Sequence, residues 1–182
     1  LISRIAYMVE EQRIPSSHIL LVTFTKKAAT EMTERLAKLS SSALYANITV
    51  GTYHAICLRI LREQGRDFQV LSSEASKHFR FKMILKKLGL ADDYTPEAVI
   101  NIISKWKNRM LRPIDIKTQA QNVKNVSEKT EMFTLHKVYE LYEQDKEARN
   151  ELDFDDFLLE VYYLLLYDDE ARAMYQERFR YV

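Results

Sequence analysis

Two short apolar runs, each followed by a segment with helical spacing, constrain the fold of this chain most strongly. The first run, residues 19–24, is continuous and rich in branched side chains, as is typical of a buried strand. A helix is predicted over about 26–39, with Ala28, Met32, Leu36 and Leu39 as its buried stripe. A second strand at 48–50, closed by Gly51, precedes a helix predicted over 53–64. The order strand, helix, strand, helix predicts a parallel α/β sheet.

The remainder of the chain is predicted to be helical almost throughout. Ser72 is expected to cap a helix that ends at Gly89, and Thr95 begins one that reaches Leu111. Residues 114–125 are expected to form a loop or a short helix, followed by a long helix over about 128–149. Asp153 and Asp168 each begin a further helix, and residues 179–182 resemble the start of a strand. The fold class is therefore α/β, mostly helical, and the sheet needs strands beyond the two identified.

Composition excludes several classes of protein and of site. One cysteine, Cys57, allows no internal disulfide and no cysteine metal cluster, and it fits a reducing compartment such as the cytoplasm, where we expect the protein. No apolar run reaches the roughly 18 residues of a membrane span. The three glycines, Gly51, Gly65 and Gly89, cannot form a phosphate-binding loop of the G-x-x-x-x-G-K-[ST] kind. The chain opens without methionine inside a predicted helix, so we expect an excised fragment.

The net charge of +1 hides an uneven distribution. Residues 1–138 hold 22 basic and 13 acidic side chains, and residues 139–182 hold 5 basic and 13 acidic ones. The basic part indicates a polyanion as partner. Neutralisation of the two parts across a packed interface explains the same pattern, so charge alone leaves both explanations open.

The two strand ends carry the first candidate binding residues. Thr25 can cap the helix after the first strand, and Lys26 and Lys27 lie at its positive end, where the dipole disfavours cations by roughly 0.3–1 kcal/mol. Two lysines there indicate a bound anion, or else are merely solvated. After the second strand, Thr52 is a cap, Tyr53 can stack on a base and His54 can donate to a phosphate or serve structure. Both strands end at the same sheet edge, where open α/β sheets bind ligands.

Two further stretches have both a functional and a structural interpretation. Residues 105–113 contain four cations and no acid, and these can follow a nucleic-acid backbone or form a solvated helix end. The cations are Lys105, Lys107, Arg109 and Arg112. Asp153, Asp155 and Asp156 indicate either a metal site or the start of a helix. We favour helix capping and predict no metal site.

Together these stretches resemble the UvrD/Rep/PcrA family of superfamily-one DNA helicases. Residues 22–32 are similar to the family pattern V-T-F-T-N-K-A-A-x-E-M, with Lys26 in place of asparagine. Residues 51–54 and 59–62 resemble G-T-F-H and R-I-L-R, with Tyr53 in place of phenylalanine. Asp153 and Phe154 resemble the start of D-F-x-x-L-L, with the two leucines displaced by one position. Residues 177–182 resemble the lead-in to the D-E-x-x-D strand.

The resemblance implies a partial RecA-like domain (1A) at 1–54 and 166–182, with an inserted helical subdomain (1B) at 55–165. It implies a 3′-to-5′ helicase whose single-stranded DNA track includes Phe24, Thr25, Thr52, Tyr53 and His54, with Lys26 able to contact phosphate. The inserted subdomain would face the junction with duplex DNA. In the family the ATP-binding loop precedes residue 1 and the Mg²⁺-binding motif follows residue 182. ATP and Mg²⁺ therefore belong to the parent protein, and this piece alone is expected to bind neither and to be inactive.

Two functions of other classes remain as alternatives. One is a helical protein-interaction module, in which the basic and acidic parts serve protein partners. The other is a metal-dependent nuclease that uses Asp153, Asp155 and Asp156, which ranks lower because no lysine lies near these acids in sequence. The process that the parent protein serves, whether repair, replication restart or recombination, stays open.

Overall fold

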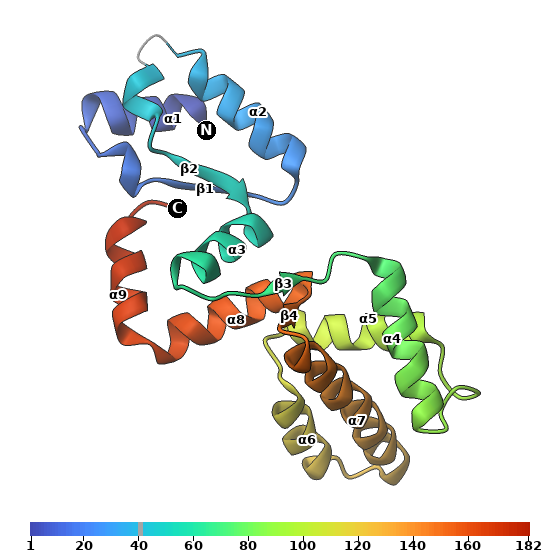
Figure 1. The fold of residues 1–182 in the computed structure, drawn as a ribbon. Helices are drawn as coiled ribbons and strands as arrows, with labels where there is room; N and C mark the ends of the chain where they lie inside the picture. Colours follow the sequence, from blue (N-terminus) through green and yellow to red (C-terminus); the bar gives the residue numbers. More distant parts are fainter. Residues whose placement is uncertain (40–41) are drawn as a thin grey trace. The chain divides into compact units, whose positions relative to one another are not determined.

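The computed structural model describes residues 1–39 and 42–182, which form two compact units. Unit 1 comprises Leu1–Glu63 and Tyr163–Val182, and unit 2 comprises Gln64–Tyr162. Unit 2 is thus inserted into unit 1 in the sequence, with boundaries after residues 63 and 162. The resemblance to the helicase family implies domain boundaries after residues 54 and 165. Most described residues are helical and the strands pair in parallel (Figure 1), which confirms the predicted fold class.

Unit 1 is built on a parallel pair of strands. β1 (Leu20–Thr23) and β2 (Thr49–Thr52) pair in register from Leu20 opposite Thr49 to Thr23 opposite Thr52. α2 (Lys26–Ala37) connects them and packs on both. Residues near the C-terminus add one bridge beside β1, because Leu20 N–H donates to the carbonyl oxygen of Tyr181 at 2.8 Å. The strand predicted at 179–182 is therefore present only as this single bridge.

The strand pair is covered on both faces. Ile19 and Leu21 point to one face and pack with Leu36 of α2 and Ile5 of α1 (Ile2–Ala6), because alternate strand residues share a face. α3 (Tyr53–Glu63) packs on the other face. Gly51 permits its close approach, since the Ile56 side chain lies 3.0 Å from the position that a Cβ would take. A π-helical turn (Tyr7–Glu11) and 3₁₀ turns at Ser16–His18 and Ser42–Tyr45 complete the first segment.

The chain returns to unit 1 along α8 (Phe154–Tyr167), which begins in unit 2. α9 (Asp169–Arg178) follows, and Asp168 caps it by accepting from Ala171 N–H at 2.9 Å, as predicted. Tyr175 is buried against α3, where its hydroxyl donates to Glu63 at 3.2 Å. Arg178 also binds Glu63, at 2.8 Å, so α9 is fastened to the end of α3.

Unit 2 contains four helices of its own and one short strand pair. The helices are α4 (Glu74–Lys87), α5 (Pro96–Asn108), α6 (Pro113–Asn122) and α7 (Val126–Ala148). Ser73, rather than Ser72, caps α4, and Thr95 caps α5 as predicted, accepting from Ala98 N–H at 3.3 Å. α5 ends before the predicted Leu111, because Met110 adopts the left-handed region at φ 58°. β3 (Gln69–Val70) and β4 (Glu151–Leu152) form a parallel pair that the sequence did not indicate.

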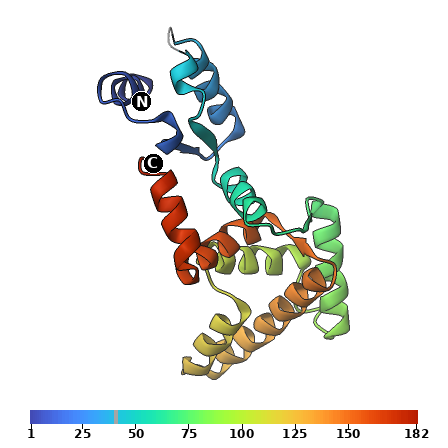
Figure 2. The ribbon, with the colours of Figure 1, turned by 60° about the vertical axis from the view of Figure 1, so that its left-hand side comes forward.

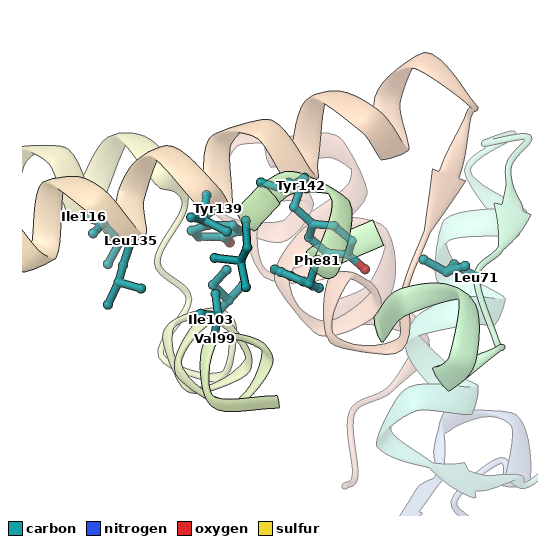
Figure 3. Close-up of a cluster of buried hydrophobic side chains, with 11 residues drawn as sticks. Leu71, Phe81, Val99, Ile103, Ile116, Leu135, Tyr139 and Tyr142 are labelled. Atoms are coloured by element: carbon teal, nitrogen blue, oxygen red, sulfur yellow. The ribbon is translucent and has the colours of Figure 1, made fainter. Parts of the chain in front are cut away.

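α7 is the central helix of the unit 2 core. It lies beside α6 in both views (Figures 1 and 2) and also contacts α4. Figure 3 shows its Tyr139 and Tyr142 among side chains from α4, α5 and α6. The rings of Tyr142 and Phe81 lie 4.3 Å apart between centroids. The fully or almost fully buried core residues are Leu71, Phe81, Ile84, Leu85, Val99, Ile103, Ile116, Leu135, Val138, Tyr139 and Tyr142.

Candidate nucleic-acid interface

The two predicted strand ends meet at one edge of the sheet in unit 1. Thr23 lies opposite Thr52 in the parallel register, so the next residues, Phe24 and Tyr53, emerge side by side. Their ring centroids are 5.5 Å apart with the planes inclined at 48°. Phe24 is 90% exposed and Tyr53 is 46% exposed. An aromatic pair open to solvent offers two flat surfaces on which unpaired bases can stack.

Threonines begin the helices behind this aromatic pair. Thr25 Oγ1 accepts from Ala28 N–H at 3.2 Å, and Thr52 Oγ1 accepts from Ala55 N–H at 3.3 Å. Both threonines are therefore helix caps, as predicted. Thr23 adds a hydrogen bond from its hydroxyl to the Thr25 carbonyl oxygen at 3.0 Å, which fixes the turn that presents Phe24.

Two lysines and a histidine follow the aromatic pair in the sequence. Lys26 and Lys27 occupy the first turn of α2 and are exposed, and this turn contains no acidic residue. Within the described residues neither lysine has an ion-pair partner. His54 is exposed in the first turn of α3. Aromatic rings and polar or charged side chains thus share one edge. Lys26 and Lys27 lie at a helix N-terminus, where an anion would relieve an unfavourable interaction with the helix dipole.

The four cations between residues 105 and 112, which we predict to contact DNA, differ in how exposed they are. Lys105 and Arg109 are exposed at the end of α5 in unit 2. Arg112 is half-buried before α6, and its guanidinium donates to Glu160 at 3.1 Å. Lys107 is 1% exposed. A side chain without exposed surface cannot contact a phosphate backbone, so the prediction that Lys107 binds DNA is wrong.

Lys107 lies instead in a buried cluster of lysines and carboxylates. Its ammonium donates to Asp156 at 2.6 Å and to Asp153 at 3.1 Å. Lys146 binds Asp156 from α7, and Tyr142 donates its hydroxyl to Asp153 at 2.9 Å. Glu143 Oε1 lies 2.9 Å from the Lys107 nitrogen and forms an ion pair with it, but it accepts no hydrogen bond. We call Lys107, Lys146, Glu143, Asp153, Asp156 and Tyr142 the buried ionic cluster.

The ionisation of this cluster follows from burial and mutual attraction. Burial alone would raise the pKa of Asp153, but the neighbouring Lys107, Lys146 and Lys77 outweigh it and hold this pKa well below its usual range. Burial raises the pKa of Asp156 to about 6 against the attraction of Lys107 and Lys146, so its carboxylate is still ionised at neutral pH. The pKa of Lys107 is raised above its ordinary value because three carboxylates outweigh the effect of its burial.

The carboxylates of 153–156 also begin α8. Asp156 N–H donates to Asp153 at 3.1 Å and Asp153 N–H donates to Asp156 at 2.7 Å, which is a reciprocal capping arrangement. This confirms the predicted capping role of Asp153. The three lysines that reach these acids come from α4, α5 and α7, which their distance in sequence concealed. No group of metal-ligating side chains occurs in residues 1–39 and 42–182.

One apolar surface was not singled out by the sequence. Phe79 and Met83 of α4 are 61% and 49% exposed, one helical turn apart. Helical spacing in the sequence could have identified this surface, since Phe79 and Met83 lie away from the face formed by the buried Phe81, Ile84 and Leu85.

The helices that the structure describes include no candidate for a membrane span, because none combines the required length with sufficient apolar character.

Comparison with known proteins identifies the family of the chain. The whole chain, residues 1–182, matches the family model of the UvrD/REP helicase N-terminal domain. ATP-dependent DNA helicase PcrA of Leuconostoc citreum is 32% identical over 98% of the chain, and UvrD1 of Mycobacterium leprae is 33% identical over 98%. The chain spans 24% and 23% of the length of these two relatives. The chain belongs to the UvrD/REP helicase family and matches its N-terminal domain along its entire length.

Proposed function

We propose that this chain is the part of an ATP-dependent, 3′-to-5′ DNA helicase that contacts single-stranded DNA. The exposed Phe24–Tyr53 pair at the carboxyl ends of two paired parallel strands is the observation that carries the proposal. The names of the relatives, ATP-dependent DNA helicases PcrA and UvrD1, supply the activity of the whole protein. Base stacking on rings does not depend on sequence, which suits a protein that moves along a strand.

Each residue at this edge has a distinct part in the proposal. Phe24 and Tyr53 stack on successive bases, and Thr25 and Thr52 hold the turns that present them. Lys26, Lys27 and His54 bind the phosphates beside those bases. In unit 2, the exposed Lys105 and Arg109 contact the phosphate backbone near the duplex junction, and Arg112 does so with its charge partly neutralised by Glu160.

The domain assignment that we propose rests on the membership of the chain in the helicase family. Residues 1–54 and 166–182 belong to a RecA-like domain 1A, and residues 55–165 form subdomain 1B. The residues of this chain do not fit the phosphates of ATP, because two of its three glycines end helices at positive φ and none belongs to a phosphate-binding loop. We therefore assign ATP and Mg²⁺ to other parts of the parent protein, and expect this chain alone not to hydrolyse ATP.

Of the alternatives, the nuclease has no support in the geometry. Asp153 and Asp156 are buried, cap α8 and bind lysines, so their oxygens are engaged within the fold. The protein-interaction module is favoured by a separate observation, the exposed apolar side chains of α4. That surface lies in unit 2 and is compatible with DNA contact by unit 1.

Replacing Lys26 and Lys27 together with glutamine is expected to weaken the salt dependence of DNA binding. Each phosphate contact with single-stranded DNA contributes about 0.7 to the slope of log affinity against log salt, so the slope should fall by about 1.4. Fluorescence anisotropy with a labelled oligo-dT strand, titrated at several salt concentrations, measures it. The matched control replaces Lys117 and Lys124, two exposed lysines of unit 2. An unchanged slope in the first variant would contradict phosphate contact by these lysines.

A further inference from the structure

Helices α4 and α7 enclose a groove in unit 2 that DNA contact by unit 1 does not use. It has a volume of about 820 Å³, and its apolar lining includes Phe79, Met83 and Ile84 of α4 and Leu141 of α7. Phe79 and Met83 are 61% and 49% exposed, so large apolar surfaces face solvent here. Exposed apolar patches of this kind mark interaction sites on soluble proteins.

Charged side chains also line the groove. Three are cations, Lys87, Arg80 and Arg149, and one is an acid, Asp145. Asp145 is bound by Arg80 at 3.1 Å and by Arg149 at 3.2 Å, and Arg80 also binds Glu151. Lys87 has no ion-pair partner among the described residues, and the same is true of the nearby exposed Lys82 and Lys86. The groove therefore complements a ligand that is apolar in the middle and acidic at its edges.

The dimensions of the groove match a short helix. Its α4 wall runs from Ala75 to Lys87, which is about 18 Å at 1.5 Å per residue, or roughly three helical turns. Phe79 and Met83 repeat at four-residue spacing along this wall. Amphipathic helices bind such grooves through apolar side chains at positions i, i+3 or i+4, and i+7, and methionine adapts to varied side chains.

We propose that this groove binds an acidic amphipathic helix of a protein partner. Nucleic acid fits it less well, because a single aromatic side chain, Phe79, is among its lining residues, whereas single-stranded nucleic acid sites offer several rings to successive bases. The recessed aliphatic side chains Ile84 and Leu141 suit leucine or isoleucine side chains of a peptide. The proposal is independent of the DNA-binding function assigned to unit 1.

The test uses the 182-residue chain and a labelled 14-residue peptide with leucines at positions 3, 6, 7 and 10 and mostly glutamates elsewhere. A peptide of the same composition in scrambled order is the control ligand. We expect the first peptide to bind, and Phe79→Ala and Lys87→Glu each to weaken it by about tenfold or more. Ile114→Ala and Lys124→Glu, which change exposed residues outside the groove, should leave the affinity unchanged.

Three outcomes would overturn the proposal. The first is no binding of the amphipathic peptide at millimolar concentration, and the second is equal binding of the scrambled peptide. The third is displacement of the peptide by oligo-dT together with loss of oligo-dT binding in Phe79→Ala, which would make the groove a nucleic-acid site. Phe24 and Tyr53 lie outside the groove, so Phe79→Ala should leave oligo-dT binding by unit 1 intact. Failure of peptide binding can therefore be distinguished from failure of DNA binding.

Discussion

Replacing Lys107 with methionine is expected to lower the free energy of unfolding of unit 2 by about 3–5 kcal/mol. The ammonium of Lys107 lies within 3.1 Å of Asp153, Asp156 and Glu143, and its side chain is fully buried. Methionine fills similar volume but leaves three carboxylates with Lys146 as their principal partner. Uncompensated buried charge is what makes the removal of one partner so costly, whatever the net value of the intact cluster.

Urea unfolding followed by the fluorescence of Trp106 measures this effect, because the only tryptophan of the chain lies in unit 2, with its ring centroid 6.2 Å from that of Tyr139. Lys105→Met is the matched control, since Lys105 is exposed two residues earlier on the same helix. Its effect should stay within about 0.5 kcal/mol. A stability of Lys107→Met within about 1 kcal/mol of the wild type would show that the cluster does not depend on this ammonium.

Replacing both Phe24 and Tyr53 with alanine is expected to weaken binding of oligo-dT by about 30-fold or more. Each base stacked on an aromatic ring contributes roughly 1–3 kcal/mol, and tenfold in affinity corresponds to about 1.4 kcal/mol. Phe24 is 90% exposed, so its loss removes little from the packing of unit 1. Fluorescence anisotropy at fixed low salt gives the affinity.

The control for this pair is a variant that loses two other exposed aromatic side chains of unit 1. Tyr7 and Tyr167 are 56% and 75% exposed, and Tyr7→Ala with Tyr167→Ala should leave oligo-dT affinity unchanged. Equal losses in both double variants would mean that exposed rings bind the strand without preference for this edge. Unchanged affinity in the Phe24 and Tyr53 variant would show that bases do not stack on these two rings.

The site at the sheet edge was predictable because it depends on local sequence. Apolar runs identified both strands, and parallel pairing of those strands then placed the residues that follow them side by side. The caps Thr25, Thr52, Thr95 and Asp153 were predictable for the same reason, since a cap bonds to an amide three residues along the chain.

The buried ionic cluster could not be predicted in this way. Lys107 continues the buried stripe of Val99 and Ile103 at four-residue spacing, which was the one local signal of its burial. Its partners Asp153 and Asp156 follow 46 and 49 residues later, and no spacing rule links them. The β3–β4 pair could not be predicted either, because strands of two residues are too short to show an alternation of apolar and polar side chains.

If single-stranded DNA lies on the Phe24–Tyr53 pair, photo-crosslinking should join its bases to these two rings. An oligo-dT strand carrying 5-iodo-deoxyuridine would be irradiated with the wild-type chain, and the crosslinked peptides identified by mass spectrometry. We expect crosslinks at Phe24 or Tyr53 and none at Phe79, an aromatic side chain of unit 2 whose exposure of 61% lies between the 90% of Phe24 and the 46% of Tyr53. Crosslinks confined to other residues, with the peptides containing Phe24 and Tyr53 unmodified, would contradict it.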